Sequence, residues 1–521
     1  MKEFNTTGVC IPEMHYMVDI RGKIVKIMKL VENGKYFTIN RARQYGKTTT
    51  LFMLTRLLPE EYTCINLSFE GMGDTMFKNP EMFCQRILWK ISKELNLIDK
   101  SYGEKWKDSN ITDFDLLAHK ISTLASGKKL ILIIDEVDKT SNSRVFLQFL
   151  GMLRNLFLNR TKISTFQSVI LAGVHDIKNI KLKIKKEGLY SSPEDQERLY
   201  NSPWNIAANF NVDMSFSPDE IATMLEAYEA DHSTNMCVEI ISHELHKYTN
   251  GYPYLVSRLC QLIDEDLSSN WTISGVQEAV KIIMSEKNTL FDELFKNLAN
   301  NPEINELMYA VLVQGNKRAR SRRSQSVEWS EMFGYLSVER TGELSISNKI
   351  FEGILIDHFI TEEAMAAPAN KEVCNTLRSN IIVDGIFSME LCLRKFAEFY
   401  NSVYSEEDIP ALERHARLIF LAYLHPLVNG YGFYHIESQF TDSRRMDVVL
   451  DYGTNQYIIE LKLWYGEAAH ERAFSQLLGY MDTKNTDKGY LLTFDLRLKK
   501  NRQPKAEWIS ISDKKIFNVV V

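Results

Sequence analysis

Short apolar runs alternate with amphipathic stretches over the first half of the chain. The runs with strand character are KYFTINRA, YTCINLSF, KLILIIDEVD and SVILAGV, and stretches with helical periodicity lie between them. Buried strands separated by helices are typical of a parallel α/β sheet. The pattern therefore predicts an α/β domain over residues 1–235.

The second half of the chain divides into a helical part and a second α/β part. Residues 236–365 are mostly helical and end in a helix, a hairpin around Arg340–Thr341–Gly342 and another helix, an order that suits a winged-helix module. An Ala-rich passage, HFITEEAMAAPANKEV, then predicts a linker. Residues 366–521 begin with helix and continue with GFYHIESQF, RRMDVVLDYG and QYIIELKLW as strands, HERAFSQLLGYMD as a helix and GYLLTFD as a strand. The fold class is an α/β multidomain protein.

Composition and charge narrow the class of protein. The 521 residues are 45% hydrophobic and 25% charged, the balance of a soluble globular protein. The net charge of −6 excludes a chain-wide basic field, so any contact with nucleic acid must be local. Seven scattered cysteines without a CxxC pair indicate reduced thiols. With no signal-peptide region and no membrane-length apolar run, we expect a cytoplasmic protein without a membrane partner.

A phosphate-binding loop follows the first predicted strand. The predicted strand KYFTIN is followed by a loop that ends in Gly46–Lys47–Thr48 and then by a helix. This is the structural context expected of a Walker A motif. Backbone N–H groups of the loop and the helix N-terminus cradle phosphates, Lys47 adds a point charge and the Thr48 hydroxyl can bind Mg²⁺. The motif's first glycine is replaced by Arg41. The predicted ATP contacts in the loop are Arg43, Gln44, Tyr45, Gly46, Lys47, Thr48 and Thr49.

An acidic pair ends the third predicted strand. Five apolar residues run directly into Asp135 and Glu136, which places both carboxylates at the carboxyl end of a buried strand, where ligands of such sheets bind. Asp135 would hold Mg²⁺ through water, and Glu136 would orient or deprotonate the attacking water. A solvated acidic turn and a coincidental GKT are the bland alternatives. The two motifs together predict a nucleotide-binding domain.

These motifs resemble the AAA-like ATPases of prokaryotes, in which an Arg-rich loop precedes GKT as in RARQYGKTTT. The resemblance covers roughly residues 8–360, includes NSPWNIA and SFSPDEI, and implies ATP binding and hydrolysis. It also implies a sensor at His175 or Asp176 in VILAGVHDI and places Pro253 of the TNGYP segment near the adenine. The arginine finger stays open among Arg154, Arg160 and Arg198.

A second cluster of charged residues lies near the end of the chain. Glu460 and Lys462 are two apart, so on a strand they project from the same face, within an otherwise apolar run. A turn at 451–455 would fold this run against RRMDVVLDYG and bring Asp447 beside Glu460. Two carboxylates and a lysine form a divalent-metal site in which Lys462 orients water or helps deprotonate it.

This spacing resembles the PD-(D/E)XK nuclease superfamily, although its usual proline is Met446 here. The resemblance makes Asp447, Glu460 and Lys462 catalytic and gives Glu413 the first acidic position, with Glu437 as a rival ligand. Gln476 and Tyr480 match a QxxxY element, in line with Arg472 on one helix face. The alternatives are an ion pair on an exposed edge strand and a helix salt bridge between Glu413 and Arg417.

Three further segments carry weaker signals for zinc, phosphate or base binding. His243–Glu244–Leu245–His246 has the wrong spacing for zinc. The basic cluster at 317–323 is either a phosphate contact or a solvated loop. Trp464 and Tyr465 either stack a base or belong to the core.

The sequence predicts an ATP-binding and ATP-hydrolysing protein whose C-terminal domain is a Mg²⁺-dependent nuclease. Its cofactors are ATP and Mg²⁺, its partner is nucleic acid with DNA favoured, and defence or mobile-element biology is the expected setting. The alternatives are a signalling ATPase or a winged-helix regulator whose nuclease-like domain only binds nucleic acid. Assembly into a homo-oligomer or with a partner protein stays open.

Overall fold

The computed structural model divides into two compact units. Unit 1 comprises Met1–Val276 and Met332–Gly334, and unit 2 comprises Gln277–Glu331 and Tyr335–Val521. The structure describes residues 2–73, 75–98, 111–137, 143–173, 204–312, 324–339, 341–366, 381–383, 386–403, 409–428, 432–437, 446–452, 455–464, 466–484, 486–496, 505–511 and 513–521.

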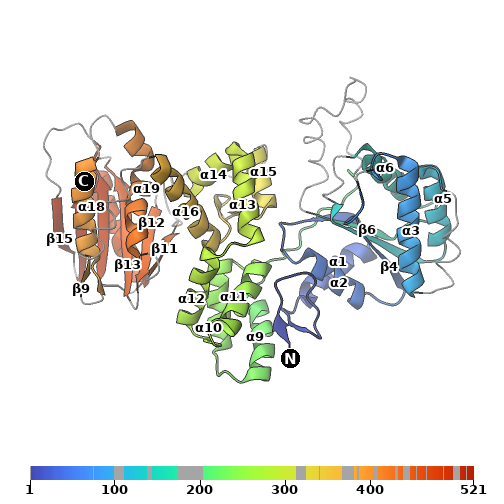
Figure 1. Ribbon diagram of the computed structural model, residues 1–521, viewed down its shortest axis with the longest axis horizontal. Coiled ribbons are helices and arrows are strands. Elements are labelled where there is room, and N and C mark those ends of the chain that lie inside the picture. The colour runs from blue at the N-terminus through green and yellow to red at the C-terminus, as the bar shows by residue number, and fades with distance from the viewer. Residues whose placement is uncertain are drawn as a thin grey trace. The chain divides into compact units, whose positions relative to one another are not determined.

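A parallel sheet forms the centre of unit 1 (Figure 1). Its strands run in the spatial order β3-β6-β5-β4, and every neighbouring pair is parallel. They are β3 (Tyr36–Asn40), β4 (Tyr62–Ser68), β5 (Lys129–Asp135) and β6 (Ser168–Gly173). A parallel bridge from Phe37 to Ala208 adds backbone at the free edge of β3. The four apolar runs are thus the four strands, and the predicted parallel α/β sheet is confirmed.

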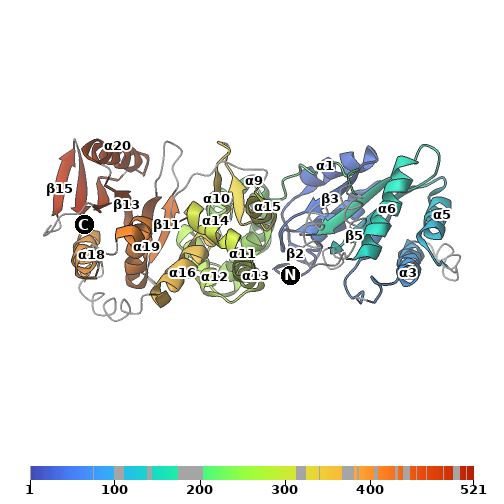
Figure 2. The same cartoon turned by 90° about the horizontal axis from the view of Figure 1, so that it is seen from above.

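Helices cover both faces of this sheet. In Figures 1 and 2, α3, α5 and α6 lie on one face and α1 and α2 on the other. Their bounds are α1 (Arg21–Glu32), α2 (Lys47–Leu57), α3 (Pro80–Ile98), α5 (Phe114–Ala125) and α6 (Arg144–Leu158). Polar caps fix where α5 and α6 begin, because Asp113 and Ser143 accept hydrogen bonds from first-turn N–H groups. The interior between sheet and helices is rich in phenylalanine, including Phe69, Phe83, Phe146 and Phe149.

A helical part completes unit 1. It contains α9 (Pro218–His232), α10 (Val238–Thr249) and α11 (Pro253–Glu265), and two short paired strands near the N-terminus, β1 (Glu3–Phe4) and β2 (His15–Tyr16). The start of α9 carries a capping box between Ser217 and Glu220, with Pro218 in the first turn.

The first part of unit 2 is helical. The helices are α12 (Ile273–Ser285, which crosses the boundary between the units), α13 (Thr289–Asn300), α14 (Pro302–Leu312), α15 (Gln325–Met332) and α16 (Lys349–Ala366). Between α15 and α16, β7 (Leu336–Val338) pairs antiparallel with β8 (Leu344–Ile346). This is the hairpin that the sequence predicts.

The second part of unit 2 is a six-stranded mixed sheet in the order β11-β12-β13-β14-β16-β15. Its strands are β11 (Gly432–Glu437), β12 (Met446–Tyr452), β13 (Asn455–Leu463), β14 (Lys488–Phe494), β15 (Lys505–Ile511) and β16 (Lys514–Val520). Beside it lie α18 (Met389–Val403), α19 (Ile409–Val428), α20 (Glu467–Lys484) and the short pair β9 (Ile382–Val383) and β10 (Ile386–Phe387).

The helices of this domain lie on opposite faces of its sheet. In Figure 2, α20 covers one face and α18 and α19 the other. The chain connects β13 to the parallel strand β14 through α20. The elements follow the predicted order of helix, three strands, helix and strand.

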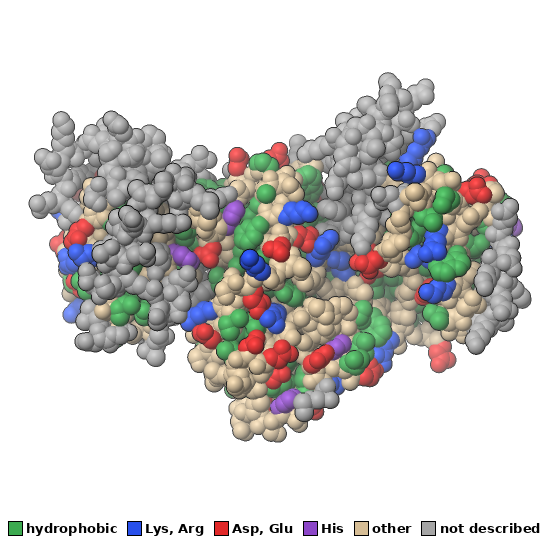
Figure 3. All heavy atoms as spheres, viewed as in Figure 1, with side chains coloured by type: hydrophobic (Ala, Val, Ile, Leu, Met, Phe, Trp, Pro, Cys, Tyr) green, Lys and Arg blue, Asp and Glu red, His purple; other side chains and the backbone are tan. Residues whose placement is uncertain are grey.

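The surface carries charges of both signs. Figure 3 shows basic and acidic side chains interspersed over the part of the molecule that α9 to α12 occupy in Figure 1. This mixture agrees with a net charge of only −6. Among the helices that the structure describes, none combines the length and apolarity needed to span a bilayer.

Candidate functional site

The loop between β3 and α2 has the backbone of a phosphate cradle. Gly46 (φ +74°) and Gln44 (φ +55°) take left-handed conformations, which turn the chain sharply before α2 begins at Lys47. No side chain that the structure describes caps the first turn of α2. The Lys47 ammonium donates to the backbone oxygens of Arg41 at 2.9 Å and Ala42 at 2.8 Å, so it lies over the loop. An uncapped helix N-terminus beside a lysine suits an anion.

The acidic end of β5 meets the start of α2. The Thr48 hydroxyl donates to Asp135 Oδ2 at 2.8 Å, which joins two motifs that lie far apart in the sequence. Glu136 adopts φ +57°, and its backbone N–H donates to Asp135 Oδ1 at 2.8 Å. A hydroxyl and a carboxylate in contact are oxygen ligands of the kind that Mg²⁺ prefers. The residues present therefore fit a magnesium ion held by Thr48 and Asp135.

Arg41 anchors the loop from outside. Its guanidinium donates to the backbone oxygens of Asn40 at 2.8 Å and Val212 at 2.9 Å and lies over the ring of Phe210. Burial lowers the pKa of this guanidinium, the direction expected when a cation loses water. Arg41 thus joins the phosphate loop to the segment that leads to α9. This contact gives a structural reason for an arginine at the position of the motif's first glycine.

A cavity of about 360 Å³ opens beside the loop, entirely within unit 1. Gln44, Tyr45, Gly46, Thr49 and Thr50 form its floor. Its other walls come from the N-terminal segment and from the helical part: Asn5, Thr6, Thr7, Gly8, Cys10, Tyr16, Met17, Val18, Ile20, Lys23, Met214, Phe216, Met224, Pro253, Tyr254 and Ser257. The volume and the largely apolar lining are those of a small-molecule site.

Most of these wall residues were not predicted from the sequence to contact nucleotide. Only Gln44, Tyr45, Gly46, Thr49 and Pro253 were predicted to contact nucleotide. The N-terminal segment carries no motif, and its Cys10 N–H donates to Thr49 Oγ1 in the first turn of α2 at 3.1 Å. Burial raises the pKa of the Cys10 thiol to about 11, so this sulfur stays protonated at neutral pH.

Tyr252 and Pro253 bring the helical part onto the loop. The Tyr252 hydroxyl donates to the backbone oxygen of Arg43 at 2.7 Å, and its ring meets Tyr45 edge-on with centroids 4.7 Å apart. A Cβ added to Gly46 would lie 3.9 Å from Pro253. Burial raises the pKa of Tyr45 to about 12, which keeps this hydroxyl neutral. Pro253 therefore lies next to the loop and lines the cavity.

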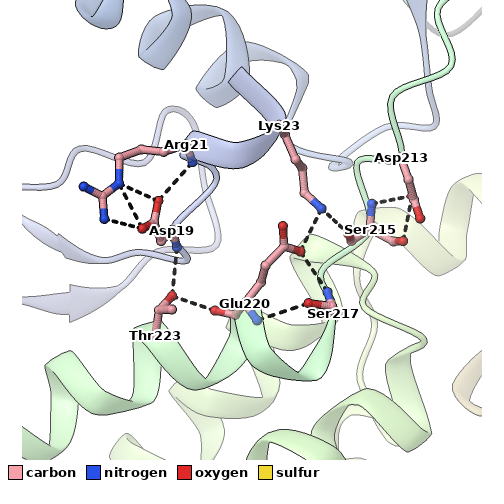
Figure 4. Close-up of polar contacts among 8 residues, drawn as sticks. All are labelled: Asp19, Arg21, Lys23, Asp213, Ser215, Ser217, Glu220 and Thr223. Carbon is pink, nitrogen blue, oxygen red and sulfur yellow. Dashed lines mark hydrogen bonds and ion pairs between the residues drawn. The ribbon is translucent and has the colours of Figure 1, made fainter. Parts of the chain in front are cut away.

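Polar contacts among Asp19, Lys23, Ser215, Ser217, Glu220 and Thr223, together called the latch, join α1 to α9 (Figure 4). The Lys23 ammonium donates to Glu220 Oε2 and to the Ser215 backbone oxygen, both at 2.7 Å. Glu220 also accepts from the Ser217 N–H at 2.9 Å. Thr223 Oγ1 accepts from the Asp19 N–H at 2.9 Å and closes the contact.

Several residues singled out in the sequence lie outside the described ranges or away from the phosphate loop. His175, Asp176, Arg198 and the start of NSPWNIA lie outside the described residues, as does the basic cluster at 317–323. Arg154 lies within α6. Arg160 donates to the Gly34 backbone oxygen at 2.8 Å, and Gly34 precedes β3, whereas the phosphate loop follows it. Arg160 therefore binds at the end of β3 opposite the phosphate loop.

In the C-terminal sheet, three acidic positions fall in one row. Glu437 of β11 is the register partner of Asp447 on β12, and Asp447 is the partner of Glu460 on β13. The hairpin turn lies where the sequence predicts it, because Tyr452 pairs with Asn455. The side chains of Glu437, Asp447 and Glu413 are not among those described, and Glu413 is placed only as a position on α19.

Glu460 is buried in the middle of the sheet. It is 1% exposed, and β13 pairs on both sides, with β12 and β14, so the alternative of an exposed edge strand is excluded. The Lys462 ammonium lies 2.5 Å from Glu460 Oε1. Burying a carboxylate beside a lysine on one strand face costs desolvation free energy. The pair is therefore a candidate functional site. No group of three or more metal-ligating side chains occurs among those the structure describes.

The helix α20 covers the face of the sheet that carries Glu460. Leu477 and Tyr480 pack with Ile458 and with Leu491, the register partner of Glu460. Tyr480 is 4% exposed, and its hydroxyl has no hydrogen-bond partner among the described residues. Gln476 is half-buried and Arg472 exposed on the same helix. A polar atom buried without a partner costs free energy, so this hydroxyl is a candidate ligand contact.

The weaker motifs take ordinary structural places. His243 Nδ1 donates to the Glu239 backbone oxygen in α10, and Glu244 pairs with Lys247. The Trp464 ring lies against His470, with centroids 4.9 Å apart. Tyr465 lies outside the described residues.

The solved structures with similar folds include three archaeal proteins. The Walker-type ATPase PABY2304 of Pyrococcus abyssi is 13% identical with a TM-score of 0.48, over 68% of this chain and 99% of its own. The ORC2 protein of Aeropyrum pernix is 13% identical with a TM-score of 0.36, over 69% and 98%. Cdc6p of Pyrobaculum aerophilum is 14% identical with a TM-score of 0.32, over 69% and 97%.

No curated protein matches the chain. The family model described as "AAA-like domain" matches residues 16–332, which is more than half of the chain. This stretch holds the phosphate loop, the acidic end of β5 and the whole lining of the cavity from Tyr16 onward. The chain therefore belongs to the AAA-like domain family, and its parallel-sheet domain is that of an AAA-like ATPase.

Proposed function

We propose that this protein binds and hydrolyses ATP in unit 1 and cleaves nucleic acid, with DNA favoured, through a Mg²⁺-dependent site in unit 2. The observation that carries the ATP half is the 2.8 Å contact from Thr48 to Asp135, which unites the two halves of a nucleotide site. The observation that carries the nuclease half is the row Glu437, Asp447 and Glu460 on neighbouring strands.

In the ATP site, each residue has a separate task. The first-turn N–H groups of α2 and the Lys47 ammonium bind the phosphates, so the ammonium exchanges its two backbone acceptors for phosphate oxygens. Mg²⁺ held by Thr48 and Asp135 supplies charge neutralisation at the phosphates. Glu136, next in sequence to Asp135, orients the attacking water. The adjoining cavity takes the base and ribose.

In the proposed nuclease site, Glu460 and Lys462 position the attacking water molecule. Mg²⁺ held by Asp447 and Glu460 supplies charge stabilisation at the scissile phosphate. Lys462 lies 2.5 Å from the Glu460 carboxylate, where its ammonium can orient the water that attacks phosphorus. The Tyr480 hydroxyl, which has no hydrogen-bond partner in the part of the chain that the structure describes, and Gln476 on α20 offer hydrogen bonds to water or phosphate on the same face.

A cleavage assay tests both halves. Single- and double-stranded DNA and RNA are incubated with Mg²⁺, with and without ATP, using the native protein, Glu460→Ala and Lys47→Ala. The matched control is Glu467→Ala, which removes an exposed carboxylate from the first turn of α20. We expect Glu460→Ala to abolish cleavage, Lys47→Ala to abolish ATP hydrolysis and Glu467→Ala to retain both activities.

The outcomes separate the claims. If the native protein cleaves none of the four substrates in either condition, unit 2 is not a nuclease. If it cleaves and the Lys47→Ala protein cleaves at the same rate with ATP present, ATP does not gate the nuclease. If Lys47→Ala hydrolyses ATP at the native rate, the phosphate loop has been assigned wrongly.

A further inference from the structure

The outer face of α3 carries an exposed tryptophan between two cations. Trp89 is 41% exposed, although burial of its indole would remove a large apolar area from water. The Arg86 guanidinium lies over its ring at 4.2 Å from the centroid, and Lys93 Nζ lies 5.8 Å from the same centroid. Spacings of three and four residues place all three side chains on one stripe of the helix.

The stripe continues with an apolar residue and is set apart from the core. Met82, four residues before Arg86, is 39% exposed on the same side of α3. The opposite side of the helix holds Phe83, Ile87 and Ile91, all buried against the sheet. Figure 3 shows basic and hydrophobic side chains next to one another over the region that α3 occupies in Figure 1. Core packing therefore does not account for Trp89.

The electrostatics of the stripe favour an anionic ligand. Lys90 Nζ donates to the Ser68 backbone oxygen at 2.7 Å, and the pKa of Lys90 is lowered by burial and then by the charges of Arg86 and Lys93. Stacking on an aromatic ring holds a guanidinium plane in place while its N–H edge stays free for phosphate. A cation pair around an exposed ring is the combination that binds a sugar-phosphate backbone and an unstacked base.

We propose that the stripe Met82, Arg86, Trp89 and Lys93 on α3 binds single-stranded nucleic acid, with Arg86 and Lys93 on phosphates and Trp89 against a base. Duplex bases stay stacked and cannot reach the ring, so the stripe discriminates in favour of single strands. This contact lies in the ATPase unit and does not depend on unit 2 being a nuclease.

Binding of a fluorescein-labelled oligothymidylate, followed by anisotropy in EDTA over a salt series, tests the proposal. The Arg86→Ala/Lys93→Ala double variant should bind at least about tenfold more weakly, and its salt slope should fall by about 1.4, the share of two phosphate contacts on a single strand. Trp89→Ala should weaken binding to the single strand more than to a duplex of the same length. Neither variant should alter ATP hydrolysis.

The control is Lys26→Ala/Lys29→Ala, which removes the same charge from exposed positions of α1. Equal affinity of the two double variants for the single strand would overturn the proposal, as would a native protein that does not bind. If instead the α3 variants bind normally but sediment as a different oligomer, the stripe is a protein interface and the nucleic-acid assignment is wrong.

Discussion

A hydrogen bond from the Thr48 hydroxyl to Asp135 brings together the two predicted motifs of unit 1. The two residues come from α2 and β5, and they meet because the carboxyl ends of parallel strands share one edge of the sheet. Each motif alone has a bland interpretation, as a chance GKT or an acidic turn. Their contact at 2.8 Å favours a shared site over both of these interpretations.

The Thr48 hydroxyl can be tested by a matched pair of substitutions. Thr48→Ala removes a predicted metal ligand and should lower Mg²⁺-dependent ATP hydrolysis by about ten- to a hundredfold, the usual effect of disturbing a metal's ligand shell. Thr48→Ser keeps the hydroxyl and should remain within a few-fold of the native rate. Equal rates for the alanine and serine proteins in a steady-state assay would argue against a ligand role.

Gly251 tests how α10 and α11 are held against the segment before α9. Its φ is +70°, and an added Cβ would lie 2.0 Å from the Phe216 backbone oxygen. Gly251→Ala should therefore lower the free energy of unfolding by at least about 2 kcal/mol, because backbone must move. Gly127 has φ +71° and open space around it, so Gly127→Ala should cost only about 1 kcal/mol of backbone strain. Urea unfolding of both variants measures the difference.

At the scale of elements, the latch between α1 and α9 is open to a double-mutant cycle. The side chains of Lys23 and Glu220 are 13% and 24% exposed, so water screens their contact poorly. Substitutions Lys23→Met and Glu220→Gln should give a coupling of about 1.5–3 kcal/mol, as for hydrogen bonds between charged groups. The exposed pair Lys129 and Glu61 should show no measurable coupling in the same cycle. Additive effects of Lys23→Met and Glu220→Gln would show that the latch does not hold α9.

The elements themselves were largely predictable from local patterns. The apolar runs became β3 to β6, and the turn after Tyr452 set the register that pairs Asp447 with Glu460. Lys23 and Glu220 were not predictable as partners, because they are 197 residues apart and each looks like an ordinary surface charge. The wall of the cavity was missed for the same reason, since the segment before α1 carries no motif. The sequence does carry a local signal for the start of α9, the capping box formed by Ser217 and Glu220.

At the scale of the whole molecule, two compact units predict two unfolding events. Multidomain chains commonly depart from a single transition. ATP with Mg²⁺ should raise the midpoint of one transition only, since a ligand at a hundred times its Kd adds about 2.7 kcal/mol to the unit that binds it. Lys47→Ala should abolish this shift in a calorimetric scan. A shift of both transitions in the native protein would show that the units unfold together.

We propose that one chain carries two separate catalytic sites, and a substitution at Glu460 tells these two sites apart. The initial rate of Mg²⁺-dependent DNA cleavage is measured for the native protein and for Glu460→Gln, with ATP hydrolysis followed in the same samples. Glu460→Gln keeps the size of a side chain that is 1% exposed and removes its charge. We expect cleavage to fall by at least about a hundredfold while ATP hydrolysis stays at the native rate. Equal cleavage by both proteins would contradict the account.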